Sequence, residues 1–319
     1  MKLGVFTAIL DHQPLETALD YLQSLGVQAV ELGCGGTAGH SHANPEILLN
    51  DADALREFQR TIDRHHMEIS ALSCHGNPVH PNPETARAYD KTIRDTILLA
   101  QRLGLRRINT FSGCPGSDPD AHYPNWVTCP WPEDFQEVLD YQWNQVLIPY
   151  WRETAAFAAE HGVTQIALEM HPGFCVYHTE SLLRLRGAVG EQIGANLDPS
   201  HLIWQGMDPI AVIRALKGAI FHFHAKDTKI DPYNTAVNGV LDTKPYREQE
   251  MRSWNFRSVG YGNGLLYWKD MISNLRMAGY DHVISVEHED GLMSRSEGLA
   301  KACGFLKDII IQEKVGITQ

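Results

Sequence analysis

The sequence lacks any long apolar run. No stretch approaches the roughly 20 apolar residues that a membrane-spanning helix requires. The opening MKLGVFTAIL meets the polar Asp11 and His12 before a signal-peptide core has formed. We therefore expect a soluble, cytoplasmic protein that neither spans a membrane nor binds one.

Basic residues are also in short supply. The 319 residues include 27 Lys and Arg against 39 Asp and Glu, which gives a net charge of −12. Nucleic acids and anionic membranes are bound chiefly through Lys and Arg, so this balance disfavours both as partners. It favours small neutral or metal-bridged ligands, and a chain with 43% hydrophobic residues can bury a large core.

Paired cysteine motifs are missing as well. The six cysteines are scattered along the chain without a CxxC pair, at Cys34, Cys74, Cys114, Cys129, Cys175 and Cys303. Neither a zinc knuckle nor a redox motif is indicated, and we expect reduced thiols.

What the sequence contains is a regular alternation of short β-rich runs and longer amphipathic stretches. The predicted strands cover residues 2–7, 28–32, 68–74, 107–111, 165–169, 194–198, 220–225 and 282–287. The predicted helices cover residues 14–25, 51–66, 83–103, 133–161, 179–189 (with Thr179 as N-cap), 208–217, 265–278 and 294–311. Eight strand-then-helix units predict an α/β protein, a closed (β/α)₈ TIM barrel. Because no linker divides residues 1–319, we expect a single domain.

Two long loops account for the length beyond the ~250 residues typical of such barrels. They span residues 112–132, after predicted strand four, and residues 227–264, after predicted strand seven. Connections that follow strands lie on the C-terminal face of the barrel, where barrel enzymes build their sites. We expect these two loops to wall a pocket.

Four potential metal ligands occur at the ends of four consecutive predicted strands. They are Glu169 after QIAL, Asp198 after ANL, His224 in FHFHAK and Glu287 after ISV. Three carboxylates converging at one barrel mouth repel one another and are costly to bury unless they have a partner. One divalent cation resolves this conflict. Oxygen ligands with one imidazole favour Mn²⁺, with Mg²⁺, Co²⁺ or Zn²⁺ as alternatives.

The competing interpretation is that each of these residues caps a strand or pairs with a neighbouring helix. Taken singly, a carboxylate at a strand end is about as often salt-bridged as metal-bound. Four such residues in register at successive strand ends favour the metal site.

Further polar residues follow the same strands. His171 and His201 each sit in a Pro-bearing turn after a proposed ligand, so we predict that both face the substrate. His75 follows ISALSC and is either a substrate contact or a structural residue. Lys226 either neutralises a developing oxyanion or pairs with Asp227. His222 shares a strand face with His224, and we interpret it as a satisfied core histidine.

Aromatic residues in the long loops are candidates for substrate binding, because aromatic faces stack on the C–H faces of sugar rings. Most tryptophans are packing residues. The three that fall in the two long loops, Trp126, Trp131 and Trp254, are predicted to wall the pocket.

The phrases LEMHPG, NLDPSHL, HFHAKD and SVEHED carry this set of residues in order along the chain. In them the sequence resembles the xylose isomerase-like TIM barrel superfamily, also described as sugar phosphate isomerases/epimerases. In relatives that act on ketoses, residues at the positions of Glu169 and Glu287 form an acid/base pair. A His at the position of His201 helps to hold the substrate.

SCHGNP, TFSGCPG, NWVTCPWP and KIDPYNTAVNGVLDTK are closer to the branch with 3-keto-glycoside epimerases, C-glycoside deglycosidases and levoglucosan-pathway lyases. The resemblance also implies a homo-oligomer, and it leaves open whether a small partner subunit completes the pocket.

The resemblance implies one shared half-reaction. A cation that chelates a sugar carbonyl and the adjacent hydroxyl acidifies the neighbouring C–H and stabilises the enediolate, while a base takes the proton. Returning the proton gives an isomerase or epimerase, and expelling a β-leaving group gives a lyase. The sequence after Glu287 reads His288, Glu289, Asp290, and these extra acids oppose a phosphate dianion. We therefore predict an unphosphorylated 3-keto sugar or glycoside as substrate.

Two rival functions carry less support. The superfamily also contains endonuclease IV, a zinc-dependent DNA repair enzyme, which needs more His ligands and a basic DNA-binding face. A non-catalytic sugar-binding barrel is the second rival. It does not account for a metal set that comes with an acid/base pair.

Overall fold

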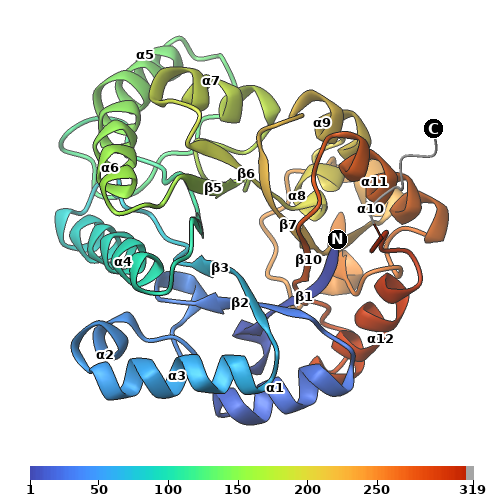
Figure 1. The fold of residues 1–319 in the computed structure, drawn as a ribbon. Helices are drawn as coiled ribbons and strands as arrows, with labels where there is room; N and C mark the ends of the chain where they lie inside the picture. The colour runs from blue at the N-terminus through green and yellow to red at the C-terminus, as the bar shows by residue number, and fades with distance from the viewer. Residues whose placement is uncertain (314–319) are drawn as a thin grey trace, which may run out of the picture.

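In the computed structural model, which describes residues 1–313, eight parallel strands close into a barrel surrounded by helices (Figure 1). Around the barrel the strands follow the order β1-β10-β7-β6-β5-β4-β3-β2. The barrel strands are β1 (Lys2–Phe6), β2 (Ala29–Gly33), β3 (Glu68–Ser73), β4 (Arg107–Thr110), β5 (Gln165–Glu169), β6 (Ile193–Leu197), β7 (Ile220–Ala225) and β10 (Val283–Val286). The predicted (β/α)₈ TIM barrel is confirmed.

Helices follow the barrel strands and pack outside them. They are α1 (Leu15–Ser24), α2 (Pro45–Asn50), α3 (Ala52–Arg64), α4 (Pro83–Arg102), α5 (Asp134–Asp140), α6 (Ile148–Glu160), α7 (Thr179–Val189), α8 (Pro199–Trp204), α9 (Pro209–Ala215), α11 (Leu265–Met277) and α12 (Arg295–Lys307). The short helices α2 and α8 were not predicted. A π-helical segment, Tyr141–Leu147, divides the predicted helix 133–161 into α5 and α6.

Helix α4 illustrates why these segments form where they do. Asn82 caps it by accepting hydrogen bonds from the backbone N–H groups of Glu84 and Thr85, and proline at the first position has no N–H that needs a partner. The apolar positions Ile93 and Ile97 recur at helical spacing and are fully buried. The capped, one-sided pattern therefore fixes both where the helix starts and which face packs on the barrel.

The N-cap of α7 differs from the predicted one. Thr179 is the first helical residue, and His178 is the cap. The His178 Nδ1 accepts from the Ser181 N–H at 3.1 Å, while Ser181 Oγ accepts from the His178 N–H at 3.2 Å. The preference for hydroxyl and carboxyl caps pointed to the threonine, but the imidazole nitrogen supplies the same acceptor.

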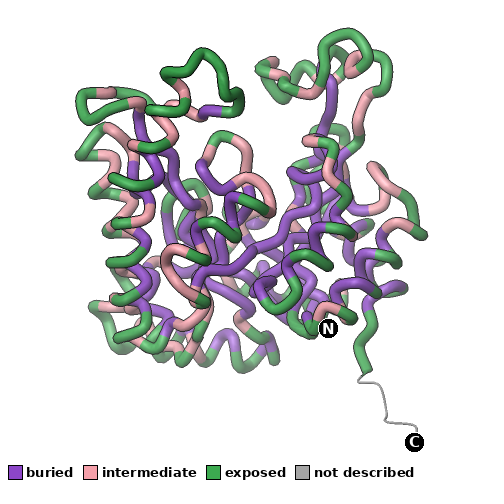
Figure 2. Tube along the Cα trace, turned by 90° about the horizontal axis from the view of Figure 1, so that it is seen from above, coloured by how far each residue is buried: buried purple, intermediate pink, exposed green. Residues whose placement is uncertain are grey.

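The two long loops follow β4 and β7, as predicted. Residues 111–131 contain no helix or strand. The long loop predicted over 227–264 has secondary structure of its own, which was not predicted: β8 (Asp227–Ile230), α10 (Pro232–Asn238) and β9 (Trp254–Arg257), with β8 paired antiparallel to β9. Figure 2 shows exposed loops rising from one end of the barrel, with the N-terminus towards the other.

The 227–264 segment is fastened at its base by one buried carboxylate. Asp227 Oδ2 accepts from the backbone N–H groups of Gly260, Gly262 and Asn263 at 3.0, 3.1 and 2.9 Å, and from Trp268 Nε1 at 3.1 Å. Asp227 Oδ1 accepts from Asn263 Nδ2 at 2.7 Å. The start of the insertion is thereby tied to its end.

We expect Asp227→Ala to lower the free energy of unfolding by about 3–5 kcal/mol, since several donors lose their acceptor and each buried unmet donor costs about 1–3 kcal/mol. The matched control is Asp208→Ala, which removes only the N-cap of α9 and costs about 1 kcal/mol. Urea unfolding followed by fluorescence compares the two. Equal losses would show that Asp227 does not anchor the segment.

Three further sequence expectations concern reduced cysteines, the lack of a membrane-spanning helix and tryptophans that pack in the core. All six cysteines are free, and Cys129 is the exposed one. Within residues 1–313, no helix has both the length and the apolarity to cross a membrane. The tryptophans Trp151 and Trp268 are fully buried in the main hydrophobic core.

Candidate metal centre and active site

The structure brings the four predicted ligands together at one mouth of the barrel. Glu169 is the last residue of β5, Asp198 follows β6, His224 belongs to β7 and Glu287 follows β10. Potential ligand atoms of all four lie within 4.8 Å of one another. Glu169, Asp198 and His224 are buried, and the Glu287 side chain is 16% exposed.

Several buried atoms at this mouth lack a hydrogen bond within the part of the chain that the structure describes. They are His75 Nε2, Asp198 Oδ2, His201 Nε2 and Glu287 Oε2. A buried polar atom without such a partner costs about 1–3 kcal/mol. A divalent ion held by Glu169, Asp198, His224 and Glu287 would give Asp198 Oδ2 and Glu287 Oε2 the partner that they lack. Carboxylate oxygens with one imidazole nitrogen are suitable ligands. The residues present therefore fit a bound cation.

Charge at the mouth is unbalanced. Burial raises the pKa of Asp198 well above its usual range, and the Glu169 and Glu287 carboxylates add to this shift against the opposing charge of Lys226. Burial disfavours the charged ring of His224, but nearby carboxylates outweigh it and hold the His224 pKa well above its usual range. The protons on Asp198 and His224 therefore occupy atoms at which a cation would bind, so protonation and metal binding compete.

Three predicted histidines surround Glu169. His75 Nε2 lies 3.0 Å from Glu169 Oε2, and His201 Nε2 lies 3.3 Å from both Glu169 Oε1 and Asp198 Oδ2. The His171 ring stands 4.0 Å from the His201 ring, centroid to centroid. Burial lowers the pKa of His201 to about 3, so this ring is neutral and offers one donor and one acceptor.

Lys226 points into the same site. Its Nζ lies 2.7 Å from Glu289 Oε2, 3.4 Å from Glu287 Oε1 and 4.3 Å above the Phe256 ring. The sequence left open a pair between Lys226 and Asp227. In the structure Asp227 instead accepts hydrogen bonds at the base of the 227–264 segment. Lys226 is oriented towards the pocket.

A pocket of about 520 Å³ lies over this cluster. Glu169, Glu287, His75, His171 and Lys226 contribute to its lining. Aromatic side chains form much of the remaining wall: Phe6, Phe111, Phe174, Tyr246 and Phe256. Its size and its mixture of apolar walls and convergent polar groups are typical of a small-molecule site.

The three predicted tryptophans do not line this pocket. Trp126 lines a separate pocket of about 240 Å³ beside α7. Trp131 is 73% exposed. Trp254 is buried, stacked on Trp204 at 4.5 Å between ring centroids. The position of these tryptophans in long loops did not determine where their side chains point. The aromatic walls of the main pocket come instead from the phenylalanines and the tyrosine named above.

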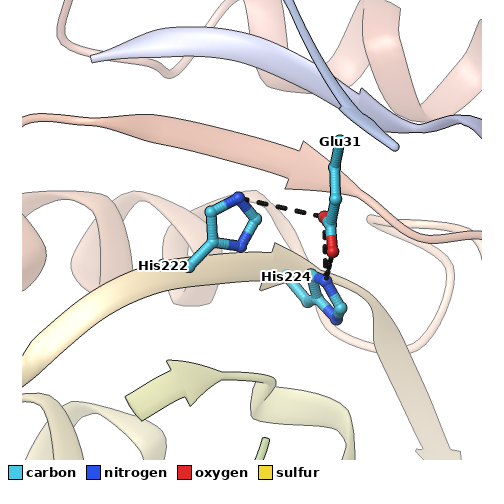
Figure 3. Close-up of side chains that lie close together, drawn as sticks. All are labelled: Glu31, His222 and His224. Atoms are coloured by element: carbon cyan, nitrogen blue, oxygen red, sulfur yellow. Dashed lines mark hydrogen bonds and ion pairs between the residues drawn. The ribbon is translucent and has the colours of Figure 1, made fainter. Parts of the chain in front are cut away.

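Sequence reasoning missed Glu31, which lies on β2 and is fully buried inside the barrel. Its carboxylate faces His222 and His224 of β7 (Figure 3). The available signal was a charged residue within the apolar strand AVELG. His222 has partners on both ring nitrogens, Asn196 Oδ1 at 3.0 Å and Ser70 Oγ at 3.2 Å, as expected of a core histidine.

Comparison with known proteins identifies the family. The model of the xylose isomerase-like TIM barrel family matches residues 19–309, and the chain belongs to this family. An uncharacterized protein of Bacillus subtilis (strain 168), YfiH, is 40% identical over 314 residues, which cover 98% of this chain and 100% of that protein. An inosose dehydratase of Geobacillus thermodenitrificans is 25% identical over 170 residues, 52% of this chain and 54% of that protein.

Solved structures share the fold. A zinc-containing IolI protein superposes with a TM-score of 0.65 at 20% identity, covering 97% of this chain and 98% of that one. A D-tagatose 3-epimerase-like protein gives a TM-score of 0.64 at 20% identity with the same coverage of both chains. These likenesses show that the fold is shared. The chemistry has to be argued from the side chains of this chain.

Proposed function

We propose that this protein is a divalent-metal-dependent isomerase or epimerase that removes a proton next to the carbonyl of an unphosphorylated keto sugar or glycoside. The observation that carries the proposal is the convergence of Glu169, Asp198, His224 and Glu287 beside a sugar-sized pocket, with unpartnered buried oxygens on Asp198 and Glu287. Within the family, we propose that the protein is most similar in function to the branch that acts on 3-keto-glycosides.

The proposed roles follow from position. A divalent cation, when bound, supplies the positive charge that polarises a carbonyl and acidifies the neighbouring C–H. Glu169 and Glu287, which come from separate strands and both line the pocket, take up the proton and return it. His201 and His171 orient substrate hydroxyls, and the charged Lys226 neutralises developing negative charge on a substrate oxygen.

The proposed metal is Mn²⁺. Three carboxylates and one imidazole form a hard, oxygen-rich ligand set, which suits Mn²⁺ better than a thiolate-binding ion. Mg²⁺, Co²⁺ and Zn²⁺ are alternatives, and the related IolI structure is described with zinc. Metal analysis of the purified protein decides among them.

The charges around the pocket support an unphosphorylated substrate. Both cations that line it already face carboxylates: Lys226 faces Glu289, and Arg295 donates to Asp11 at 2.8 Å. A phosphate dianion would have to displace a carboxylate from one of them. The sequence also assigned Asp290 to this repulsion, but Asp290 is buried, accepts from the backbone N–H groups of Ser258 and Leu292, and is not part of the pocket lining.

We expect a keto sugar to be turned over with a kcat/KM at least about tenfold above that of its phosphate ester, equivalent to about 1.4 kcal/mol. The reason is repulsion by the half-exposed Glu289. Glu289→Gln should narrow the difference. Turnover confined to phosphorylated sugars would refute this assignment.

An adjoining pocket supports a substrate larger than one ring. It has a volume of about 190 Å³ and shares Tyr246, Phe256 and Glu289 with the main pocket. Gln249 and Asn255 add polar groups to it. A glycoside can place its second ring there against the aromatic faces.

A lyase is the second candidate. Expulsion of a β-leaving group from the same carbanion gives an unsaturated ketone in place of an epimer. The partial similarity to an inosose dehydratase favours this outcome. Lys226, whose charged ammonium group lines the pocket, can protonate a leaving oxygen.

The remaining proposals concern partners and location. The net charge of −12 supports a small-molecule substrate over nucleic acid or a membrane surface. We propose a cytoplasmic homo-oligomer. Nicking of an abasic duplex would revive the endonuclease IV alternative.

The deciding experiment is incubation of the metal-loaded protein with 3-keto glucosides and free ketoses in D₂O. Deuterium incorporated without change of skeleton supports the isomerase or epimerase. Release of an aglycone or formation of an unsaturated product supports the lyase. Absence of exchange with every substrate and metal would contradict both.

A further inference from the structure

The interior of the barrel contains a polar layer just below the ligand cluster. Barrel interiors are usually filled by branched apolar residues. Here Glu31, with an exposure of 0%, stands at the centre of polar side chains from several strands. A buried carboxylate is strongly destabilising unless its oxygens are paired and hydrogen-bonded.

Three strands hold the Glu31 carboxylate in place. Ser73 Oγ of β3 donates to Oε1 at 2.5 Å, and Asn109 Nδ2 of β4 donates to the same oxygen at 2.9 Å. The hydroxyl of Ser285 on β10 donates to Oε2 at 2.7 Å. The carboxylate therefore has a fixed position before any metal binds.

The fixed carboxylate faces the metal-site histidine. His224 Nε2 lies 2.9 and 3.0 Å from the two oxygens of Glu31. An ionised carboxylate only accepts, so Nε2 carries the proton. Nδ1 faces Glu287 Oε2 at 3.0 Å and Glu169 Oε2 at 3.4 Å. It is therefore the ring nitrogen on the side of the proposed ligands, and its lone pair becomes available to a cation that displaces its proton.

We infer that Glu31 is a positioning residue, which selects the His224 tautomer and ring orientation that present Nδ1 to a divalent cation. This inference rests on the proposed metal site but not on the identity of the substrate. Carboxylate partners of metal-binding histidines orient the ring and raise its basicity.

Glu31, His222 and His224 also lie close enough together to be considered a second metal site. Hydrogen bonding argues against it. Glu31 and His224 already stand at hydrogen-bond distance, and both ring nitrogens of His222 face Asn196 and Ser70. One ion per chain is therefore expected.

The test compares Glu31→Gln with the matched control His222→Gln, from the same layer. Each apo protein is titrated with Mn²⁺ against a chelator of known affinity. We expect Glu31→Gln to weaken Mn²⁺ binding by roughly 10–100-fold. We expect His222→Gln to change it less than about threefold, because the His222 ring nitrogens face Asn196 and Ser70 and His222 is not part of the proposed ligand set. The stoichiometry should stay at one, and visible spectra of the Co²⁺-loaded proteins should shift for Glu31→Gln alone.

Several outcomes would overturn the inference. They are unchanged affinity in Glu31→Gln, an equal loss in His222→Gln, or two ions in the natural protein with one in Glu31→Gln. If Glu31→Gln does not fold, the double variant Ser73→Ala/Ser285→Ala, which removes two of the three donors that hold the carboxylate, must show the weakened binding. If the natural protein binds Mn²⁺ and Glu31→Gln binds it equally well, only this inference fails. If the natural protein binds no metal at all, the proposed function fails as well.

Discussion

Glu169→Gln is expected to lower the rate of substrate C–H exchange by about 10²–10⁴-fold, the range for loss of a general acid or base. Glu169 contacts His75 and His201 and lies 3.4 Å from His224 Nδ1. Glutamine keeps the shape but cannot take up a proton, and it is also a weaker metal ligand. The measurement is the initial rate of deuterium incorporation at saturating Mn²⁺.

The matched control is Glu68→Gln. Glu68 begins β3 at the opposite end of the barrel, where it forms an exposed ion pair with Lys2 at 2.5 Å. Exposed pairs contribute about 0–1 kcal/mol, so exchange should stay near the natural rate. If Glu169→Gln keeps more than a tenth of the rate while binding metal normally, another group is the base.

Removal of the metal is expected to abolish exchange and to lower the melting temperature. Glu169, Asp198 and Glu287 then face one another without a cation. At a free metal concentration 100 times the Kd, binding contributes about 2.7 kcal/mol to stability. With an unfolding entropy of about 2.1 cal/mol/K per residue, the 319 residues lose about 4 °C in Tm.

Calorimetry before and after dialysis against a chelator measures the Tm change, and the deuterium assay measures activity. Adding back Mn²⁺, Mg²⁺, Co²⁺ or Zn²⁺ separately should restore both quantities, in an order that identifies the preferred ion. A metal-free protein with full exchange activity would eliminate the metal from the proposed reaction.

Much of the barrel could be predicted from the sequence because its signals are local. Each strand is a short apolar run, and each long helix has a one-sided apolar pattern. The β8–β9 pair escaped this reasoning because Thr228 meets Phe256 only through a long-range antiparallel contact. The intervening turn-rich segment has the composition of a loop.

The candidate site divides in the same way. Glu169, Asp198 and Glu287 were predictable because topology brings the carboxyl ends of parallel strands to one rim. The position of Glu31 was not, since its partners come from strands far away in the chain and a single acid in AVELG has no periodic signature. The direction of the loop tryptophans depends on tertiary packing that composition does not encode.

Because Asp227 ties the two ends of the 227–264 segment together, the candidate site is built from two separately stabilised parts, the barrel strands and this segment. The barrel strands carry the groups proposed for proton transfer and cation binding, while the segment between Asp227 and Trp268 carries Tyr246 and Phe256, which line the same pocket. Grafting a relative's segment between these two attachment points would redesign sugar preference and leave the reaction chemistry in place.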